Sequence, residues 1–227
     1  MFQNCFNKEK IIINNRALNG RSSLSFRNEG EWKKVTDVLK PGDYVIIQFG
    51  HNDEKPDKAR HTDVGSTFDY NLEKYCIETR ELGGIPILMN SVVRRNFAKN
   101  KINIGDDEAL RNTTFVEGGK IEETEILKDT HGEYKMVPIK VAKKLNVNFV
   151  DANKITHDLE QGLGVEGSKK LHMWFLPGQE PSEPKGKQDN THYNIYGAQT
   201  VANLLADALC EEIPELKNYR IYPSENK

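Results

Sequence analysis

Short apolar runs alternate with longer amphipathic stretches along most of this chain. The runs are bounded by turn-forming residues and are rich in Ile, Val and Leu, which is typical of strands buried on both faces. They occupy residues 11–14, 44–49, 86–89 and 147–150. The second run begins directly after the turn sequence Pro41-Gly42-Asp43. These four segments are therefore predicted to be parallel strands.

Apolar residues recur at helical spacing in the intervals between these runs. The intervals with this period are residues 32–39, 70–82 and 134–145, and residues 198–209 show it again near the end of the chain. Strands that alternate with helices favour a doubly wound α/β sandwich. A length of 227 residues is compatible with one such domain over residues 1–227.

Two long stretches, residues 91–130 and 162–188, show neither period, and the second contains several glycines as well as Pro177, Pro181 and Pro184. Long ordered loops in compact domains are often functional. Asp189 and His192 follow the second stretch, so both are expected on a late loop that lies just before the C-terminal helix.

Composition narrows the function classes. With a formal net charge of -2 the chain has no broad basic field, so no nucleic-acid partner is expected. No apolar run approaches the roughly 20 residues that span a bilayer, so no membrane partner is expected, and residues 1–10 are too polar for a signal peptide. The three cysteines are scattered without metal-ligand spacing, and neither a metal nor another cofactor is expected.

Chemically useful residues follow the predicted strands. Ligands bind outside the carboxyl ends of the strands in open parallel sheets. Gly20 follows the first run, Gly50 and Asn52 follow the second, and Arg94 and Arg95 follow the third. Folding of the late loop over the same edge would add Asp189 and His192. The sequence therefore predicts one cleft.

These residue types suit ester hydrolysis. Histidine has an ordinary pKa of roughly 6.5, so His192 is the candidate general base, and Asp189 is placed to orient its ring. The backbone N–H of Gly20 and the amide of Asn52 are candidate donors to a developing oxyanion, each worth on the order of 3 kcal/mol.

Each motif also has a structural alternative. An Asp-x-x-His pair is frequent by chance, Gly50 can serve a tight turn, and Asn52 can cap a loop. His51 and Asp53 suggest a metal, but no third ligand is evident in the sequence, so structural hydrogen bonding is expected for this pair. The order of the motifs at strand ends favours a site.

At these residues the chain resembles the SGNH/GDSL hydrolases, and within them the rhamnogalacturonan acetylesterase-like group. The resemblance spans nearly the whole chain and is carried by three groups of motifs. They are Asn15-Arg16-Ala17 with Gly20-Arg21-Ser22-Ser23, Phe26 and Gly30-Glu31-Trp32; Lys40-Pro41-Gly42-Asp43-Tyr44 with Gln48-Phe49-Gly50-His51-Asn52-Asp53; and Asp189-Asn190-Thr191-His192-Tyr193-Asn194 with Gly197-Ala198.

The resemblance implies a three-layer α/β/α sandwich with a flavodoxin-like parallel sheet. It implies a serine esterase that removes acetyl groups from pectic polysaccharide without a metal. It assigns the oxyanion positions to Gly20 and Asn52, and the acid and base of the catalytic triad to Asp189 and His192.

One element of this family is absent from the sequence. The family carries its nucleophilic serine in a Gly-Asp-Ser turn after the first strand, and no Gly-Asp-Ser occurs here. Ser22, Ser23 and Ser25 are the nearest substitutes, but the family uses this segment for the oxyanion glycine and a helix start. Residues 1–7 resemble the end of the helix that follows the missing turn. An N-terminally truncated, inactive or nearly inactive chain is therefore expected, and the resemblance implies secretion or a periplasmic location with the signal missing.

The missing strand has a structural consequence. In the order 2-1-3-4-5 it lies between the strands that end at Asn14 and Phe49. Unpaired backbone on both neighbours is costly. Three outcomes are open: the two strands pair directly, a partner chain fills the gap to give a homo-oligomer by strand exchange, or the chain folds poorly.

The substrate suggests roles for further residues. Rhamnogalacturonan carries galacturonate carboxylates, which a guanidinium can hold through two bonds, so Arg94 and Arg95 are candidate substrate clamps. The alternative is a solvated pair of charges. Trp174 offers either a face for sugar stacking or part of a small loop core.

Two other functions compete with the acetylesterase. One is a non-catalytic relative that binds carbohydrate in the same cleft. The other is an SGNH esterase or lipase with a different acyl substrate.

Overall fold

A three-stranded parallel sheet forms the centre of the computed structural model, which describes residues 2–222. Its strands are β1 (Tyr44–Gln48), β2 (Ile85–Met89) and β4 (Asn148–Val150), in the order β1-β2-β4. All pairs are parallel, with Tyr44 opposite Ile85 and Ile87 opposite Asn148. Three of the four predicted strands are therefore confirmed.

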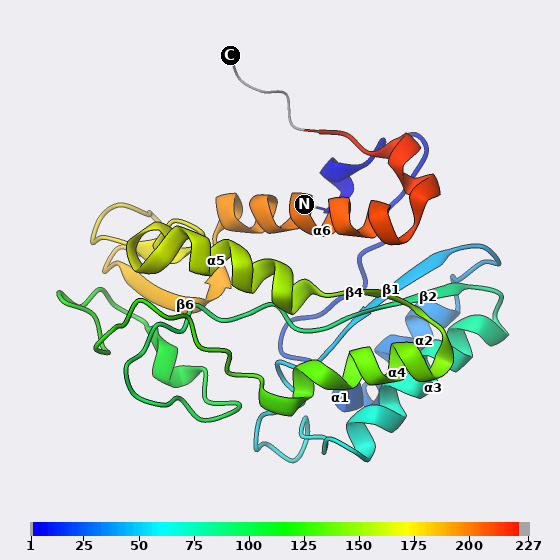
Figure 1. The fold of residues 1–227 in the computed structure, drawn as a ribbon, viewed down its shortest axis with the longest axis horizontal. Coiled ribbons are helices and arrows are strands. Elements are labelled where there is room, and N and C mark those ends of the chain that lie inside the picture. The colour runs from blue at the N-terminus through cyan, green and yellow to red at the C-terminus, as the bar shows by residue number, and fades with distance from the viewer. Residues whose placement is uncertain (1, 223–227) are drawn as a thin grey trace.

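Helices cover both faces of this sheet (Figure 1). On one face lie α1 (Ser23–Asn28), α2 (Glu31–Thr36), α3 (Thr67–Glu81) and α4 (Val137–Leu145), the last preceded by the 3-10 turn η3 (Gly132–Met136). On the other lie α5 (Ala152–Lys169) and α6 (Ile195–Glu212). The predicted three-layer α/β/α sandwich is confirmed.

A hydrophobic core lies on each face of the parallel sheet. Successive side chains of β2 point to opposite faces, so this strand contributes to both cores. Leu88 packs among residues of α3 and α4, whereas Ile87 and Met89 pack among residues of α6. An all-apolar strand such as β2 is thus used on both of its faces, as its sequence predicts.

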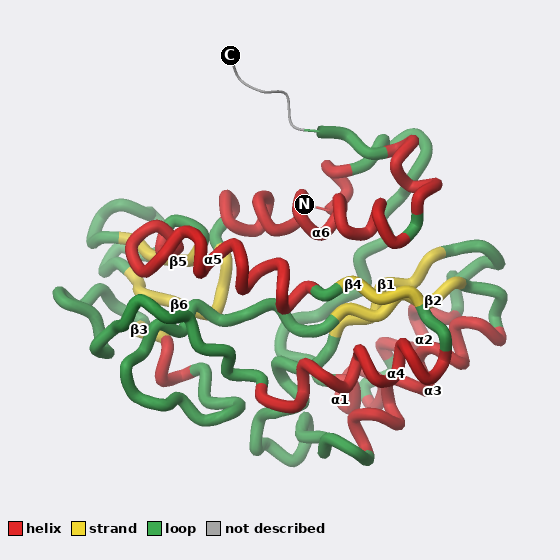
Figure 2. Tube along the Cα trace, viewed as in Figure 1, coloured by secondary structure: helices red, strands yellow, loops and turns green. Residues whose placement is uncertain are grey.

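A second, antiparallel sheet lies at the left end of the molecule (Figures 1 and 2) and was not predicted. It consists of β3 (Arg111–Asn112), β6 (Lys187–Tyr193) and β5 (His172–Phe175), in the order β3-β6-β5. Asp189 and His192 lie on β6, so the expectation that they occupy a loop is wrong. The β5–β6 pairing shifts register between His172 and Met173, a bulge that falls opposite the residues between Asp189 and Tyr193.

Helix α5 extends into the stretch predicted to be irregular. It begins at an N-cap, Asp151, whose side chain accepts from the N–H of Lys154, and it continues to Lys169. A single kink interrupts it at Gly164, where φ is 68° and ψ is -174°. The other long stretch, residues 91–130, contains β3, the 3-10 turn η2 (Glu108–Leu110) and an isolated bridge between Ala98 and Glu123.

The predicted strand at residues 11–14 is wrong, because these residues have no regular structure. Gln3 binds the segment at both ends of its amide: Nε2 donates to the Ile11 carbonyl at 2.9 Å, and Oε1 accepts from Ile13 at 2.7 Å. Among residues 2–222, β1 therefore pairs only with β2, and the direct pairing that the sequence left open does not occur.

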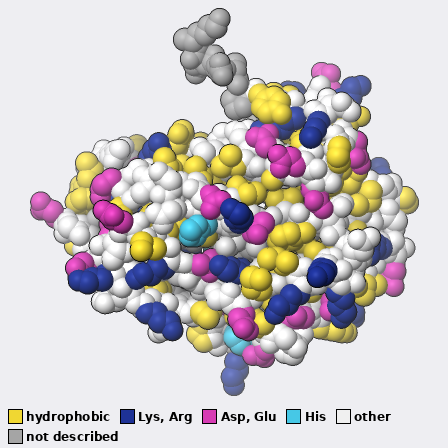
Figure 3. Space-filling view, viewed as in Figure 1, with side chains coloured by type: hydrophobic (Ala, Val, Ile, Leu, Met, Phe, Trp, Pro, Cys, Tyr) yellow, Lys and Arg dark blue, Asp and Glu magenta, His cyan; other side chains and the backbone are white. Residues whose placement is uncertain are grey.

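The ends of the described chain lie together. Residues 2–7 contain the 3-10 turn η1 (Phe2–Cys5), and Phe6 forms a bridge to Arg220, just after the 3-10 helix η4 (Pro214–Tyr219). No helix in residues 2–222 has the length and apolar character needed to cross a membrane. On the face in Figure 3, acidic and basic side chains are interspersed rather than separated by sign.

Candidate active site

Asp189 and His192 form a hydrogen-bonded pair on β6. The His192 Nδ1 lies 2.8 Å from Asp189 Oδ2, and Asp189 Oδ1 accepts from the backbone N–H groups of Thr191 and His192 at 2.8 and 3.0 Å. Burial acts to raise the pKa of Asp189, but these hydrogen bonds outweigh it and the pKa lies below its ordinary value. An ionised Asp189 keeps a proton on Nδ1 and leaves the Nε2 lone pair of His192 as the base.

The two side chains differ in access to solvent. The Asp189 side chain is 3% exposed and the His192 side chain is 55% exposed. The carboxylate is therefore fixed inside the protein, while the ring edge that would take a proton is open to a substrate.

The start of α6 fixes the backbone that follows His192. Asn194 caps this helix by accepting from the Gly197 N–H, and its Nδ2 donates to the carbonyls of Lys170 and His172. Gly197 lies so close to Leu171 that a Cβ there would collide with the Leu171 carbonyl. A glycine at position 197 is thus required for α6 to pack against Leu171, the residue before β5.

The two predicted oxyanion donors lie next to each other. The Asn52 Nδ2 donates to the carbonyl of Arg21, the residue after Gly20, at 3.2 Å. Gly20 is exposed, has a φ of 76°, and leads into α1 through its N-cap Ser22. Burial is the main cause of the lowered pKa of His51, and the charge of His192 adds a smaller contribution, so the loop after β1 lies within electrostatic range of the Asp189–His192 pair.

Asp53 holds this arrangement from inside. Its carboxylate accepts from the Ser23 N–H and hydroxyl, the Thr62 hydroxyl and the Gly50 N–H, at 2.5 to 3.1 Å. Burial raises the pKa of this carboxyl group. The expectation of structural hydrogen bonding at Asp53 is confirmed, because the residue joins the loop after β1 to the start of α1.

The three serines near Gly20 are all buried. Ser22 and Ser25 form a reciprocal capping box at the start of α1, and Ser23 is bound to Asp53. Among residues 2–222 no serine hydroxyl hydrogen-bonds to His192. These serines serve the helix start, as the sequence reading favoured.

Arg94 and Arg95 are both buried, with side chains 1% and 0% exposed. The Arg94 Nη2 lies 2.6 Å from Glu54 Oε1, and its Nη1 donates to the Thr130 hydroxyl at 2.9 Å. The predicted clamp on a substrate carboxylate is therefore wrong for these residues, and so is its alternative of a solvated pair. The sequence could not reveal their partners, because these lie far along the chain.

The environment of Arg95 is equally closed. Its guanidinium pairs with Glu123 at 2.6 Å and donates to the Val165 carbonyl and to Asn190 Oδ1. Its Nε donates to the Ser168 hydroxyl.

Trp174 lies on β5 and is half-buried. Its Nε1 donates to Asn190 Oδ1 at 2.8 Å. The Arg95 guanidinium and the Lys169 ammonium lie 5.2 and 4.7 Å from the ring centroid, so two cations already lie against the indole. Trp174 also lines a cavity of about 420 Å³.

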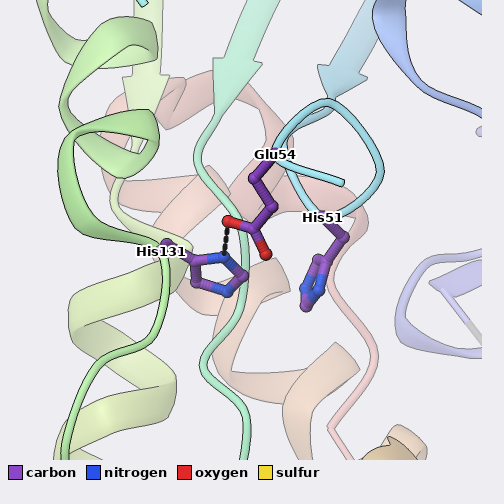
Figure 4. A group of neighbouring side chains, drawn as sticks. All are labelled: His51, Glu54 and His131. Atoms are coloured by element: carbon purple, nitrogen blue, oxygen red, sulfur yellow. Dashed lines mark hydrogen bonds and ion pairs between the residues drawn. The ribbon is translucent and has the colours of Figure 1, made fainter. Parts of the chain in front are cut away.

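The sequence reading missed a cluster of His51, Glu54 and His131 (Figure 4). Their ligand-type atoms lie within 4.8 Å of one another, which raises the question of a metal. The His131 Nδ1 lies 2.9 Å from Glu54 Oε2, and its Nε2 lies 2.9 Å from the Val92 carbonyl. Since Arg94 already places a cation 2.6 Å from Glu54, the donor set fits a buried ion-pair network better than a metal centre.

His51 completes this cluster from the side of the active site. Its ring packs edge-on against His131 at a centroid distance of 4.5 Å. Burial, followed by the charges of His131, Arg94 and His192, lowers the pKa of His51 well below its ordinary value. His51 is therefore neutral at pH 7.

Known proteins of similar sequence identify the family of this chain. No family model matches the chain. The rhamnogalacturonan acetylesterase RhgT of Bacillus subtilis is 35% identical over 213 residues, which cover 94% of this chain and 80% of that protein. A probable rhamnogalacturonan acetylesterase of the same organism, YesY, is 27% identical over 207 residues, covering 89% and 78%. The crystal structure of Bacillus subtilis protein YXIM superposes with a TM-score of 0.69 at 20% identity, covering 93% of this chain and 49% of that one.

The α/β/α sandwich and the similarity to these esterases identify an SGNH-type carboxylic ester hydrolase. At 35% identity over four fifths of RhgT, the chain belongs to the rhamnogalacturonan acetylesterase family.

Proposed function

We propose that this chain has the catalytic apparatus of a carbohydrate acetylesterase that acts on acetylated rhamnogalacturonan, and that it hydrolyses esters only at a residual rate. The observation that carries the proposal is the Asp189–His192 pair, with its carboxylate buried and its base exposed. The substrate class is supported by the names of the relatives RhgT and YesY.

The chemistry assigns one role to each residue. The acetyl carbonyl oxygen would accept hydrogen bonds from the Gly20 N–H and from the Asn52 amide as it gains negative charge. His192 Nε2 would take a proton from the attacking hydroxyl and return it to the sugar oxygen as the C–O bond of the ester breaks. In a serine hydrolase the acetyl-enzyme is then cleaved by water, again with histidine as base.

The slow rate of ester hydrolysis is expected because, in the part of the chain that the structure describes, no serine hydroxyl is placed beside His192 to act as the nucleophile. No serine of residues 2–222 hydrogen-bonds to His192, so water would have to attack directly. In serine proteases that lack part of the triad, the oxyanion hole and substrate binding still give about 10³- to 10⁴-fold acceleration over water. A slow reaction that depends on His192 and Asn52 is therefore expected.

The test measures initial rates with p-nitrophenyl acetate, with and without methanol as a small nucleophile. His192→Ala and Asn52→Ala are each expected to lower the slow rate about tenfold or more, and methanol is expected to raise the rate of the unchanged chain. His157→Ala is the matched control, because His157 is a partly exposed histidine on α5 that pairs with Asp158. A rate unaffected by His192→Ala would refute the assigned base, and rapid turnover at ordinary esterase rates would refute the inactivity.

The burial of Ser22, Ser23 and Ser25 favours a second candidate function, a non-catalytic carbohydrate binder. Saturable binding of acetylated oligosaccharide without any His192-dependent ester cleavage would support it. A panel of acetate, butyrate and octanoate aryl esters separates the acetylesterase from a lipase-like enzyme, because only the former prefers the acetyl group.

A further inference from the structure

The cavity of about 420 Å³ beside Trp174, here named the Trp174 pocket, lies next to the candidate active site. Its walls come from residues 109–123, from the end of α5, and from β5 and β6. Gln188 and Asn190, which flank Asp189 on β6, form part of it. Since two residues of chain span at most about 7 Å, the Cα of Asn190 lies within that distance of the Cα of His192.

Asn190 presents an unused donor to the Trp174 pocket. Its side-chain oxygen accepts from the Arg95 guanidinium at 2.9 Å and from the Trp174 indole N–H at 2.8 Å. Only an oxygen can accept two such donors, so the orientation of the amide is settled by chemistry. The NH2 group is left without a hydrogen-bond partner among residues 2–222, although the residue is only 5% exposed.

Arg95 and Trp174 thereby gain a role that differs from the one predicted for them. Neither is free to hold a ligand itself. Both hold the Asn190 oxygen, so they are positioning residues that direct its NH2 group.

The charges around the pocket favour an anionic ligand. Lys120 lines it, is exposed, donates only to the Glu108 backbone carbonyl, and forms no ion pair with any residue of 2–222. Lys169 is paired with Glu166 at 2.6 Å, and Glu123 is paired with Arg95 at 2.6 Å. The opposite charges cancel within each of these two ion pairs, so Lys120 is left as the uncompensated charge of the pocket wall.

We propose that the Trp174 pocket is a carbohydrate subsite that binds a hexuronate unit of the polysaccharide, with the Asn190 NH2 donating to the sugar and Lys120 pairing with its carboxylate. The apolar part of the wall, which includes Phe115 and Leu176, matches the C–H faces of a pyranose. This subsite deepens the proposed function, since it places an acidic sugar beside the acetyl ester that His192 would attack.

Binding is tested with unacetylated trigalacturonate by isothermal titration calorimetry on the whole chain, with a neutral xylose trisaccharide for comparison. Lys120→Ala is expected to weaken trigalacturonate binding about fivefold, as suits one partly exposed charge pair, and to leave neutral-sugar binding unchanged. Lys101→Ala, an exposed lysine of the same irregular segment outside the pocket, is the matched control and is expected to change nothing.

Asn190→Asp gives a second, independent variant. It keeps oxygens for Arg95 and Trp174, so the thermal midpoint is expected to stay within a few degrees, but it replaces the donor with a negative charge and should abolish trigalacturonate binding. Equal binding of acidic and neutral sugars, an unchanged Kd in Lys120→Ala, or no saturable binding at millimolar sugar would each overturn the subsite. Because no ester is involved, these results are independent of the p-nitrophenyl acetate assay that tests the proposed function.

Discussion

At the scale of single residues, the Asp189 carboxylate is subject to two opposing effects. Burial favours its neutral form, whereas three hydrogen bonds from His192 and Thr191 favour its ionised form and prevail. Because the folded-state pKa is below the ordinary value of about 3.9, ionised Asp189 stabilises the fold above that pH. The contribution disappears as pH falls through the lower folded-state pKa.

Asp189→Asn is therefore expected to reduce the free energy of unfolding at pH 7 by about 1.5–3 kcal/mol, the usual range for hydrogen bonds to a charged group. The difference from the unchanged chain should shrink when both are measured near pH 3. Urea unfolding at the two pH values provides the comparison. Asp37→Asn, which removes an exposed carboxylate paired with Lys33, should show little effect at either pH; an equal loss in both variants would contradict the prediction.

At the scale of secondary-structure elements, the contact between α6 and Leu171, the residue before β5, depends on one residue without a side chain. A Cβ at Gly197 would meet the backbone of Leu171, which cannot move like the tip of a flexible side chain. The start of α6 would therefore have to move away from Leu171, the residue that precedes β5.

Gly197→Ala is expected to destabilise the protein by about 1–3 kcal/mol through overpacking, measured by urea unfolding. Gly162→Ala in α5 is the matched control, since a Cβ there has no neighbour within 4 Å. Alanine in a helix interior is better than glycine by about 0.5–1 kcal/mol, so the control should be neutral or stabilising. A stable Gly197→Ala variant with an unshifted midpoint would show that the contact is looser than described.

The elements that sequence patterns predicted correctly are those with strong periodicity. β2 was predicted correctly because its apolar residues are continuous and pack into both cores. α3 was predicted correctly because its apolar residues recur at helical spacing and pack into one core. α5 was not predicted, and Gly162, Gly164 and Gly167 mask the period of its second half, although only Gly164 leaves helical geometry. β6 was missed because its residues are almost all polar.

Contacts in the candidate site could be predicted from the sequence only where the two residues are close along the chain. Asp189 and His192 are close in sequence, so their pairing could be expected. The partners of Arg94 and Arg95 could not, because Glu54 and Glu123 lie 40 and 28 positions away and only the folded chain brings them close. For the same reason His131 gave no sign of its contact with Glu54.

At the scale of the whole molecule, the parallel sheet has an edge at β1. This strand pairs only with β2 among residues 2–222, and Ile46 on it is 39% exposed. An edge strand without charged residues is a template for pairing with another chain. The homo-oligomer by strand exchange considered from the sequence stays a prediction.

The chain is expected to associate as its concentration rises, as measured by size-exclusion chromatography with light scattering. Ile46→Lys should shift it towards monomer, because lysine on an edge strand opposes pairing. Ile126→Lys replaces a more exposed isoleucine outside the sheet and should not. A monomer at every concentration, or equal effects of both variants, would rule out association through β1.

The kink at Gly164 divides α5 into two parts that contact different regions of the molecule. The first part packs against α6, and Ile155 and Leu159 contribute to the core on that side. The short second part supplies Glu166 and Lys169 to the wall of the Trp174 pocket. Because the break falls between them, substitutions after Gly164 can alter the pocket while the core residues before it stay the same. Ligand preference in this part of the molecule can therefore evolve separately from the stability of the sandwich.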